Sequence, residues 1–170
     1  MSRYFVLSIL FVILLSCQKE DTPSTAPLVN WKERSIELEQ NDSSLTHGKS
    51  YLSVYPEIYS ITENKTLQLT VTVSLRNMNE ADSVFILSSK YYNTHGDLIH
   101  NYHKSPVYVL PMETVEIVLD KDDTSGGTGA NFIFDWSIKK GSTPPLFESV
   151  MILTSGQQGI SFTTTGIELK

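Results

Sequence analysis

Hydrophobic and polar residues alternate with a period of two over most of the chain beyond residue 50. Between residues 67 and 76, apolar side chains occupy every odd position and polar side chains every even position. Successive side chains of a β-strand point to opposite faces, so this run predicts a strand with one buried and one solvated face. The same alternation recurs over residues 52–58, 114–119 and 131–138. The pattern predicts a domain built of strands.

Turn-forming residues separate these runs at short intervals and leave no sustained helical stripe in the domain. Gly, Pro, Asn and Asp gather at residues 77–82, 93–96, 111–112, 125–127, 141–145 and 156–159. About seven to nine short strands with such spacing predict an all-β fold, a single antiparallel β-sandwich of immunoglobulin-like character, over residues 50–170. An open barrel is the alternative. Phe132, Phe134 and Trp136 share one parity, and we expect all three to point into the gap between the sheets.

The N-terminal segment has a different pattern. Arg3 precedes an apolar run from Tyr4 to Leu15 that only Ser8 interrupts. A charged start before such a run is typical of a signal peptide, and the run is shorter than the roughly 20 residues that a spanning helix needs. Residues 1–16 are therefore predicted to be a signal peptide.

This run ends in Leu14-Leu15-Ser16-Cys17, which resembles the lipobox of bacterial lipoproteins. The resemblance implies that Cys17 becomes the first mature residue, carries acyl chains such as palmitate, and attaches the protein to a membrane. Cys17 is the single cysteine of the chain, so an internal disulfide is excluded. An ordinary secretory peptide with an incidental cysteine is the alternative.

A polar segment follows, over residues 17–49, and its composition indicates a tether. Lys19, Glu20 and Asp21 resemble the signal that exports some Gram-negative lipoproteins to the cell surface. We therefore expect a bacterial outer-membrane lipoprotein, either exposed on the surface or facing the periplasm. Within the tether, Trp31 and its apolar neighbours Ile36 and Leu38 could dock on the domain as an extra strand or a short helix.

The net charge limits the classes of partner that the domain is expected to bind. The chain carries a net charge of −6, and removal of residues 1–16 would take away Arg3 and no acidic residue. With an acidic balance and no basic stripe, the domain is not expected to bind nucleic acid or to lie on an anionic lipid surface. The membrane contact is expected through the lipid alone.

Several segments together resemble the bacterial domain-of-unknown-function family 3124, over most of the mature chain. They are residues 74–77, Tyr91-Tyr92 with Gly96, residues 123–132 with Trp136, and residues 154–162. The resemblance implies a bacterial envelope domain and brings no catalytic residue with it.

The most chemically suggestive loop is acidic and rich in glycine. Asp120, Asp122 and Asp123 supply hard oxygen atoms that suit calcium, and further ligands could come from Thr124, Ser125 and Asn131. The spacing lacks the distal glutamate of an EF-hand, so a solvated turn is the alternative, and whether a metal binds stays open. The backbone of residues 125–129 could also bind an anion, although no P-loop lysine follows. Apart from calcium, no cofactor is expected.

A second candidate surface is aromatic. Tyr51, Tyr55 and Tyr59 share one parity opposite Leu52, Val54 and Ile58, and on one continuous strand they would present a stripe to a sugar or a peptide. Packing over a neighbouring strand is the alternative.

Catalytic residues are not identified. His95, His100 and His103 lie close in sequence, but positions 100 and 103 of a strand point to opposite faces. Ser137 and Lys140 satisfy a Ser-x-x-Lys pattern without the helix and partner motifs that this chemistry requires. The sequence favours a non-catalytic envelope lipoprotein that contacts another envelope protein or a glycan. A calcium- or anion-dependent binding module and, less favoured, a hydrolase are the alternatives.

Overall fold

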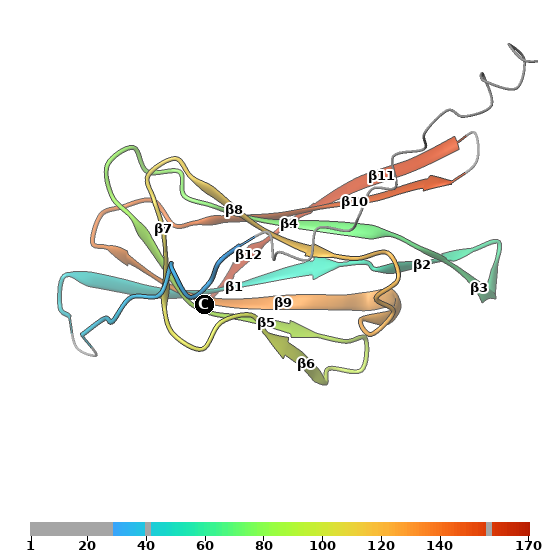
Figure 1. The fold of residues 1–170 in the computed structure, drawn as a ribbon, viewed down its shortest axis with the longest axis horizontal. Coiled ribbons are helices and arrows are strands. Elements are labelled where there is room, and N and C mark those ends of the chain that lie inside the picture. The colour runs from blue at the N-terminus through green and yellow to red at the C-terminus, as the bar shows by residue number, and fades with distance from the viewer. Residues whose placement is uncertain (1–28, 40–41, 156–157) are drawn as a thin grey trace, which may run out of the picture.

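The computed structural model describes residues 29–39, 42–155 and 158–170, and these form an antiparallel β-sandwich (Figure 1). The strands are β1 (Leu45–Val54), β2 (Glu57–Ser60), β3 (Thr62–Gln68), β4 (Thr70–Arg76), β5 (Val84–Tyr92), β6 (Leu98–Asn101), β7 (Val107–Val109), β8 (Thr114–Leu119), β9 (Ala130–Lys139), β10 (Leu146–Ser155), β11 (Gln158–Thr165) and β12 (Ile167–Leu169). One 3-10 turn, η1 (Gly127–Gly129), precedes β9. The predicted all-β sandwich is confirmed.

The strands form two packed sheets and a separate hairpin. The larger sheet has the order β12-β1-β9-β5-β6, with β7 also pairing with β5. The smaller sheet has the order β11-β10-β4-β8, and β2 pairs only with β3. The chain passes from one sheet to the other at Gly166, whose N–H donates to the carbonyl of Phe147 at 2.7 Å.

The core lies between the sheets, as the alternation predicts. Phe132 and Phe134 are fully buried and Trp136 is 1% exposed, which confirms the expected register of β9. The rings of Phe132 and Phe134 continue a stack that begins at Tyr91 on β5 and ends at Phe147 on β10, with successive centroid distances of 4.9, 5.5 and 4.1 Å. Aromatic packing therefore joins the two sheets.

Two runs that the alternation predicts as single strands are interrupted. The run 52–58 breaks at Tyr55 and Pro56, and the run 67–76 breaks at Leu69. The two breaks face each other, because the N–H of Leu69 donates to the carbonyl of Pro56 at 2.7 Å. The chain before the first break (β1) and after the second break (β4) belongs to the sandwich, and the chain between the two breaks forms the β2–β3 hairpin. Period-two alternation continues through both breaks, so the sequence pattern could not reveal them.

Residues 29–39 pack against the sandwich and form neither of the elements considered for them. Ser35 makes a single bridge to Val107 of β7, and the ring of Trp31 lies 5.3 Å from that of His103. β1 begins at Leu45, before residue 50 where the tether is expected to end. Part of the predicted tether thus belongs to the folded domain.

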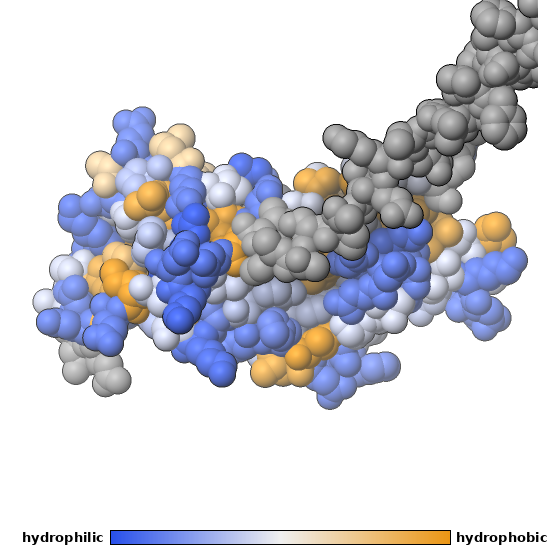
Figure 2. Space-filling view, in the orientation of Figure 1, coloured by the Kyte–Doolittle hydropathy of each residue, from blue (hydrophilic) through white to orange (hydrophobic). Residues whose placement is uncertain are grey.

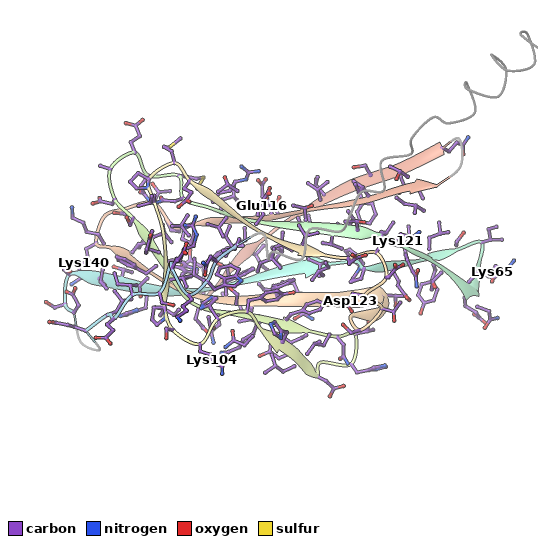
Figure 3. All side chains as sticks on the ribbon, viewed as in Figure 1. Lys65, Lys104, Glu116, Lys121, Asp123 and Lys140 are labelled. Carbon is purple, nitrogen blue, oxygen red and sulfur yellow. The ribbon has the colours of Figure 1, made fainter. Side chains whose placement is uncertain are left out.

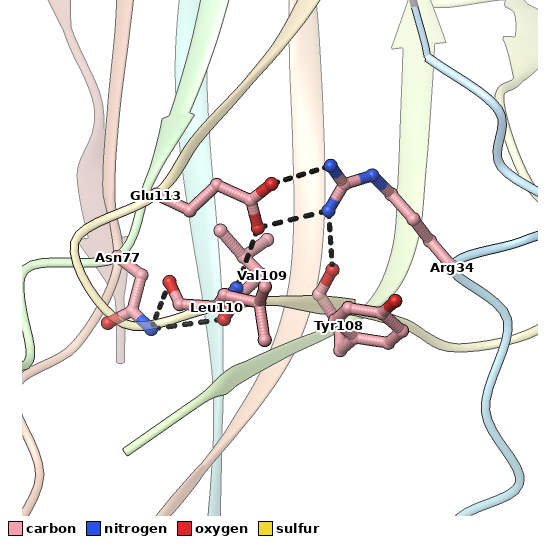
Figure 4. A network of polar contacts seen from close by, with 6 residues as sticks. All are labelled: Arg34, Asn77, Tyr108, Val109, Leu110 and Glu113. Carbon is pink, nitrogen blue, oxygen red and sulfur yellow. Dashed lines mark hydrogen bonds and ion pairs between the residues drawn. The ribbon is translucent and has the colours of Figure 1, made fainter. Parts of the chain in front are cut away.

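An ion pair fastens this segment. The two terminal guanidinium nitrogens of Arg34, Nη1 and Nη2, donate to the carboxylate of Glu113, which also accepts from the N–H of Leu110 at 2.8 Å (Figure 4). The hydrogen bond from Arg34 lowers the pKa of Glu113. Behind the pair, the side-chain amide of Asn77 donates to the carbonyls of Val109 and Leu110, both at 3.0 Å. Arg34 and Glu113, far apart in sequence, therefore hold the segment at the β7–β8 turn.

None of the helices in the described residues is long and apolar enough to cross a membrane. The predicted signal peptide, Cys17 and the Lys19-Glu20-Asp21 signal lie outside the described residues.

Candidate functional site

Three connections meet at one end of the sandwich and enclose a cleft of about 400 Å³. The β2–β3 hairpin forms one wall with Glu57, Tyr59 and Thr66. The β5–β6 turn forms a second wall through residues 93–95, and residues 124–128 of the glycine-rich loop form the floor. The cleft therefore combines parts of the chain that are distant in sequence.

Thr94 fixes the glycine-rich loop to the β5–β6 turn. Its backbone N–H and its hydroxyl both donate to the carbonyl of Gly126, each at 3.0 Å. Its hydroxyl oxygen in turn accepts from the N–H of Gly129 at 2.9 Å. The floor is thus held by three hydrogen bonds to one residue.

Glycine is required at position 126 because the floor lies directly on a buried ring. A Cβ atom at Gly126 would lie 1.9 Å from the hydroxyl oxygen of Tyr91 and 2.9 Å from Cγ of Pro56. Tyr91 is 1% exposed and its hydroxyl has no hydrogen-bond partner among the described residues. Burial and, to a smaller extent, the carboxylate of Asp123 raise the pKa of Tyr91, so this hydroxyl stays neutral. Gly127 has a positive φ of 68°, a conformation that glycine adopts at little cost.

Tyr59 forms the aromatic wall of the cleft. It pairs across the hairpin with Thr66, so the two side chains share the face that lines the cleft. The Tyr59 side chain is 62% exposed, and its ring is accessible to a bound molecule. One carboxylate (Glu57) and one imidazole (His95) stand among the hydroxyl and amide groups of the remaining lining. This combination offers a stacking surface and many hydrogen-bonding groups with little charge.

The structure brings together only some of the predicted site residues. Tyr59, Thr124 and Ser125 line the cleft, whereas Asn131 lies in β9 in register with Ser53 and Tyr92. The predicted tyrosine stripe on one strand is wrong. Tyr51 lies on β1 in the larger sheet and Tyr59 on β2 in the hairpin, because the chain leaves the sandwich at Pro56.

Tyr55, the middle residue of the expected stripe, packs against a neighbouring strand. Its ring centroid lies 6.0 Å from that of Phe162 on β11. This is the packing that the sequence leaves open as an alternative.

The acidic loop turns its carboxylates to its own backbone. Asp120 accepts from the N–H of Asp122 at 3.1 Å, and Asp123 accepts from the N–H of Ser125 at 3.0 Å. Side chains of this kind commonly stabilise turns in this way. In the parts of the chain that the structure describes, no three His, Cys, Asp or Glu side chains gather as a metal site would require. The geometry of this loop gives calcium no support.

Of the other residues considered for chemistry, His95 lines the cleft, whereas His103 and Ser137 lie elsewhere. The Nε2 atom of His103 shares a hydrogen bond of 3.0 Å with the hydroxyl of Ser89. His47 contacts Ser137 of the Ser-x-x-Lys pattern. Both serines are 0% exposed, so neither hydroxyl faces solvent. Burial lowers the pKa of His103, which favours the neutral imidazole in this pair.

Sequence reasoning misses half of the cleft lining. Asn93 and Thr94 are recognised only as part of a turn, His95 as part of that turn and as one of three neighbouring histidines, Glu57 only as a strand position, and Thr66 not at all. The turn signal at residues 93–96 is visible in the sequence, but its contact with Gly126 is a long-range one that no local pattern carries.

The comparisons with known proteins give a family and little more. No curated protein matches the chain. A solved structure described as Thermotoga maritima 1070 aligns with 14% identity and a TM-score of 0.44, over 71% of this chain and 92% of that one. A likeness this low carries no argument about function. Residues 47–169 match the family described as protein of unknown function DUF3124, and the chain belongs to that family.

Proposed function

We propose that this protein is a non-catalytic binding module of the bacterial envelope whose cleft takes a glycan. The observation that carries the proposal is the ring of Tyr59, 62% exposed, standing beside a floor of hydroxyl and backbone groups. A sugar ring has an apolar face that stacks on an aromatic side chain and hydroxyl groups that exchange hydrogen bonds at its edge. The cleft also falls within the roughly 300–1,000 Å³ of typical small-molecule sites.

An envelope protein is the second ligand class that the sequence favours. Most of the side chains that line the cleft carry a hydroxyl group beside apolar surface, and Glu57 is the one carboxylate among them, so the charged side chains of a peptide would find few partners there. The glycan therefore fits the lining better. Calcium and hydrolysis gain no specific observation in their favour.

We expect Tyr59→Ala to weaken the affinity for a glycan about tenfold, because loss of the ring removes a stacking contact worth roughly 0.5–1.5 kcal/mol beyond its area. The measurement is isothermal titration with oligosaccharides released from the envelope by mild hydrolysis. Tyr59→Phe, which keeps the ring, should retain most of the affinity. Tyr51→Ala is the matched control, since Tyr51 does not line the cleft. Equal affinities for all four proteins would refute the assignment of the cleft.

Lipidation of Cys17 belongs to the same proposal and supplies the location. Cys17→Ala should release the chain into the soluble fraction, because several acyl chains give the only strong membrane attachment that the sequence offers. Labelled palmitate should enter the native protein and not the variant. A variant that stays in the membrane fraction after high-salt washing would contradict the lipid anchor.

The side of the outer membrane on which the domain lies is addressed by the segment that follows Cys17. Lys19, Glu20 and Asp21 support a cell-surface location, with the periplasmic face of the outer membrane as the alternative. Protease shaving of intact cells distinguishes the two, since only a surface domain is cleaved before lysis.

A further inference from the structure

A second pocket lies where residues 29–39, the leading segment, meet the connection between β6 and β7. Its volume is about 410 Å³, and its lining comes from two stretches, residues 31–35 and 100–105. Backbone hydrogen bonds join these stretches just beyond the pocket. The N–H of Ile36 donates to the carbonyl of Pro106 at 2.9 Å. The N–H of Tyr108 donates to the carbonyl of Arg34 at 3.1 Å. The fold therefore fixes the two walls to each other.

Aromatic rings make up part of this lining. The ring of Trp31 lies 5.3 Å from that of His103 and 6.5 Å from that of Tyr102. His103 is 5% exposed, and both of its ring nitrogens are engaged. Nδ1 donates to the carbonyl of Ser105 at 2.9 Å, which leaves Nε2 to accept from the hydroxyl of Ser89 at 3.0 Å. His103 thus supports the half-buried ring of Trp31, which is left to contact a ligand.

Two uncharged groups of the lining are hydrogen-bond donors without an acceptor. The side-chain oxygen of Asn101 accepts from the N–H of Ser89 at 3.3 Å, so its NH₂ group points the other way. Among the described residues, neither this NH₂ group nor the indole N–H of Trp31 has an acceptor. Burial and, to a smaller extent, Asp123 raise the pKa of Tyr102 to about 12, so its phenol is neutral. A ligand that fits the pocket must bring acceptors.

The charged groups of the pocket are basic. Lys32 and Lys104 line it and are exposed, and neither Asp nor Glu is part of the lining. Neither lysine takes part in an ion pair among the described residues. Glu33 lines another cavity together with Arg34, and Glu116 lines a groove against β8. Figure 2 shows a mainly hydrophilic surface where the β6–β7 connection lies. On a chain with a net charge of −6, the pocket is a local site of positive charge.

We infer that this pocket binds a sugar that carries an oxyanion, either a carboxylate or a phosphate. The sugar ring stacks an apolar face on Trp31, and the oxyanion lies between the ammonium groups of Lys32 and Lys104. The NH₂ group of Asn101 donates to a ring hydroxyl. The inference does not depend on the cleft, because no residue lines both sites.

The first experiment titrates the full chain, in detergent solution, with glucuronate, glucose 6-phosphate, glucose and inorganic phosphate. The chain has two tryptophans, and each gives one indole N–H signal in an NMR spectrum. An acidic sugar should move the signal of Trp31, which Trp31→Phe identifies by removing it. The signal of Trp136 should stay, because its N–H donates to Ser50 in the core. Glucose and inorganic phosphate should each bind at least about tenfold more weakly, and the tighter of the two acidic sugars identifies the oxyanion.

The second experiment removes the two charges. Lys32→Gln combined with Lys104→Gln should weaken binding of the acidic sugar about tenfold, since each exposed ion pair contributes up to about fivefold. The melting temperature should be unchanged, because neither side chain pairs with another described residue. Lys65→Gln combined with Lys140→Gln is the matched control, since it removes the same charge from exposed positions outside the pocket (Figure 3). This control should bind nearly as the native chain does.

Three results would overturn the inference. One is a Trp31 signal that neither acidic sugar moves up to about 10 mM. Another is equal affinity for the acidic sugars and for glucose or inorganic phosphate, which would mean that the ring and the oxyanion are not recognised together. The third is an equal loss of affinity in the two lysine pairs, since the charge would then act from the whole surface and not from this pocket. Loss of glycan binding in the cleft alone would leave all three measurements unchanged.

Discussion

Trp136→Ala is expected to lower the free energy of unfolding by about 3–5 kcal/mol, a large share of the roughly 5–15 kcal/mol that stabilises a typical domain. The ring is 1% exposed, and its Nε1–H donates to Ser50 at 3.0 Å in the core. Gly48 lies opposite on β1, where a Cβ atom would stand only 2.2 Å from the ring. Alanine would leave both a cavity and an unpaired buried hydroxyl, which are costly together.

Chemical denaturation of the variant and the native chain measures this loss. Ile133→Ala is the control, because Ile133 lies on the same strand but on its half-buried outer face. Ile133→Ala should lower the free energy of unfolding clearly less than Trp136→Ala does. If the two substitutions cost the same, the packing between the sheets described here is wrong.

Gly126→Ala should destabilise the domain by about 1–3 kcal/mol or more and abolish binding in the cleft. The new methyl group would overlap the hydroxyl of Tyr91, which is buried and cannot swing away, so the floor must lift. The hydrogen bonds from Thr94 to the carbonyl of Gly126 would be lost with that movement. Thermal melting and glycan titration of the same variant report the two effects.

Gly129→Ala is a matched control in the same loop. There a Cβ atom would meet nothing closer than Cγ2 of Thr94 at 3.6 Å, an ordinary contact. This variant should fold and bind nearly as the native chain does. Similar losses at both positions would mean that the loop needs glycine for flexibility in general, not at Gly126 for contact with Tyr91.

The alternation of polar and apolar residues is sufficient to predict the fold class and the register of β9. Burial of alternate side chains is a local property, so Phe132, Phe134 and Trp136 are placed correctly from their parity alone. The breaks at Pro56 and Leu69 are different, because they depend on where the chain leaves one sheet for another. Missing them turns two strands into one and produces the incorrect tyrosine stripe.

The sequence predicts only part of the cleft lining. Tyr59, Thr124 and Ser125 are singled out by residue type, but for separate reasons and as separate sites. Thr94 links the β5–β6 turn to the glycine-rich loop that carries Thr124 and Ser125, through hydrogen bonds across about thirty positions, and Tyr59 of the hairpin lines the same cleft. The acidic residues raise a related difficulty: a carboxylate that supports a turn and one that binds calcium look alike in sequence, so residue type alone does not distinguish the two.

The attachment of residues 29–39 sets the path by which a mechanical load would enter the domain. A pull on the chain ahead of Val29 acts first on the Trp31 contact, then on the ion pair of Arg34, and then on the single bridge of Ser35. These three contacts follow one another along the chain, so a pulling force would break them one at a time. β1, by contrast, is hydrogen-bonded to β9 and β12 on its two sides and resists in parallel. Tension would therefore detach the leading segment from β7 and the β7–β8 turn while the sandwich and its cleft keep their shape.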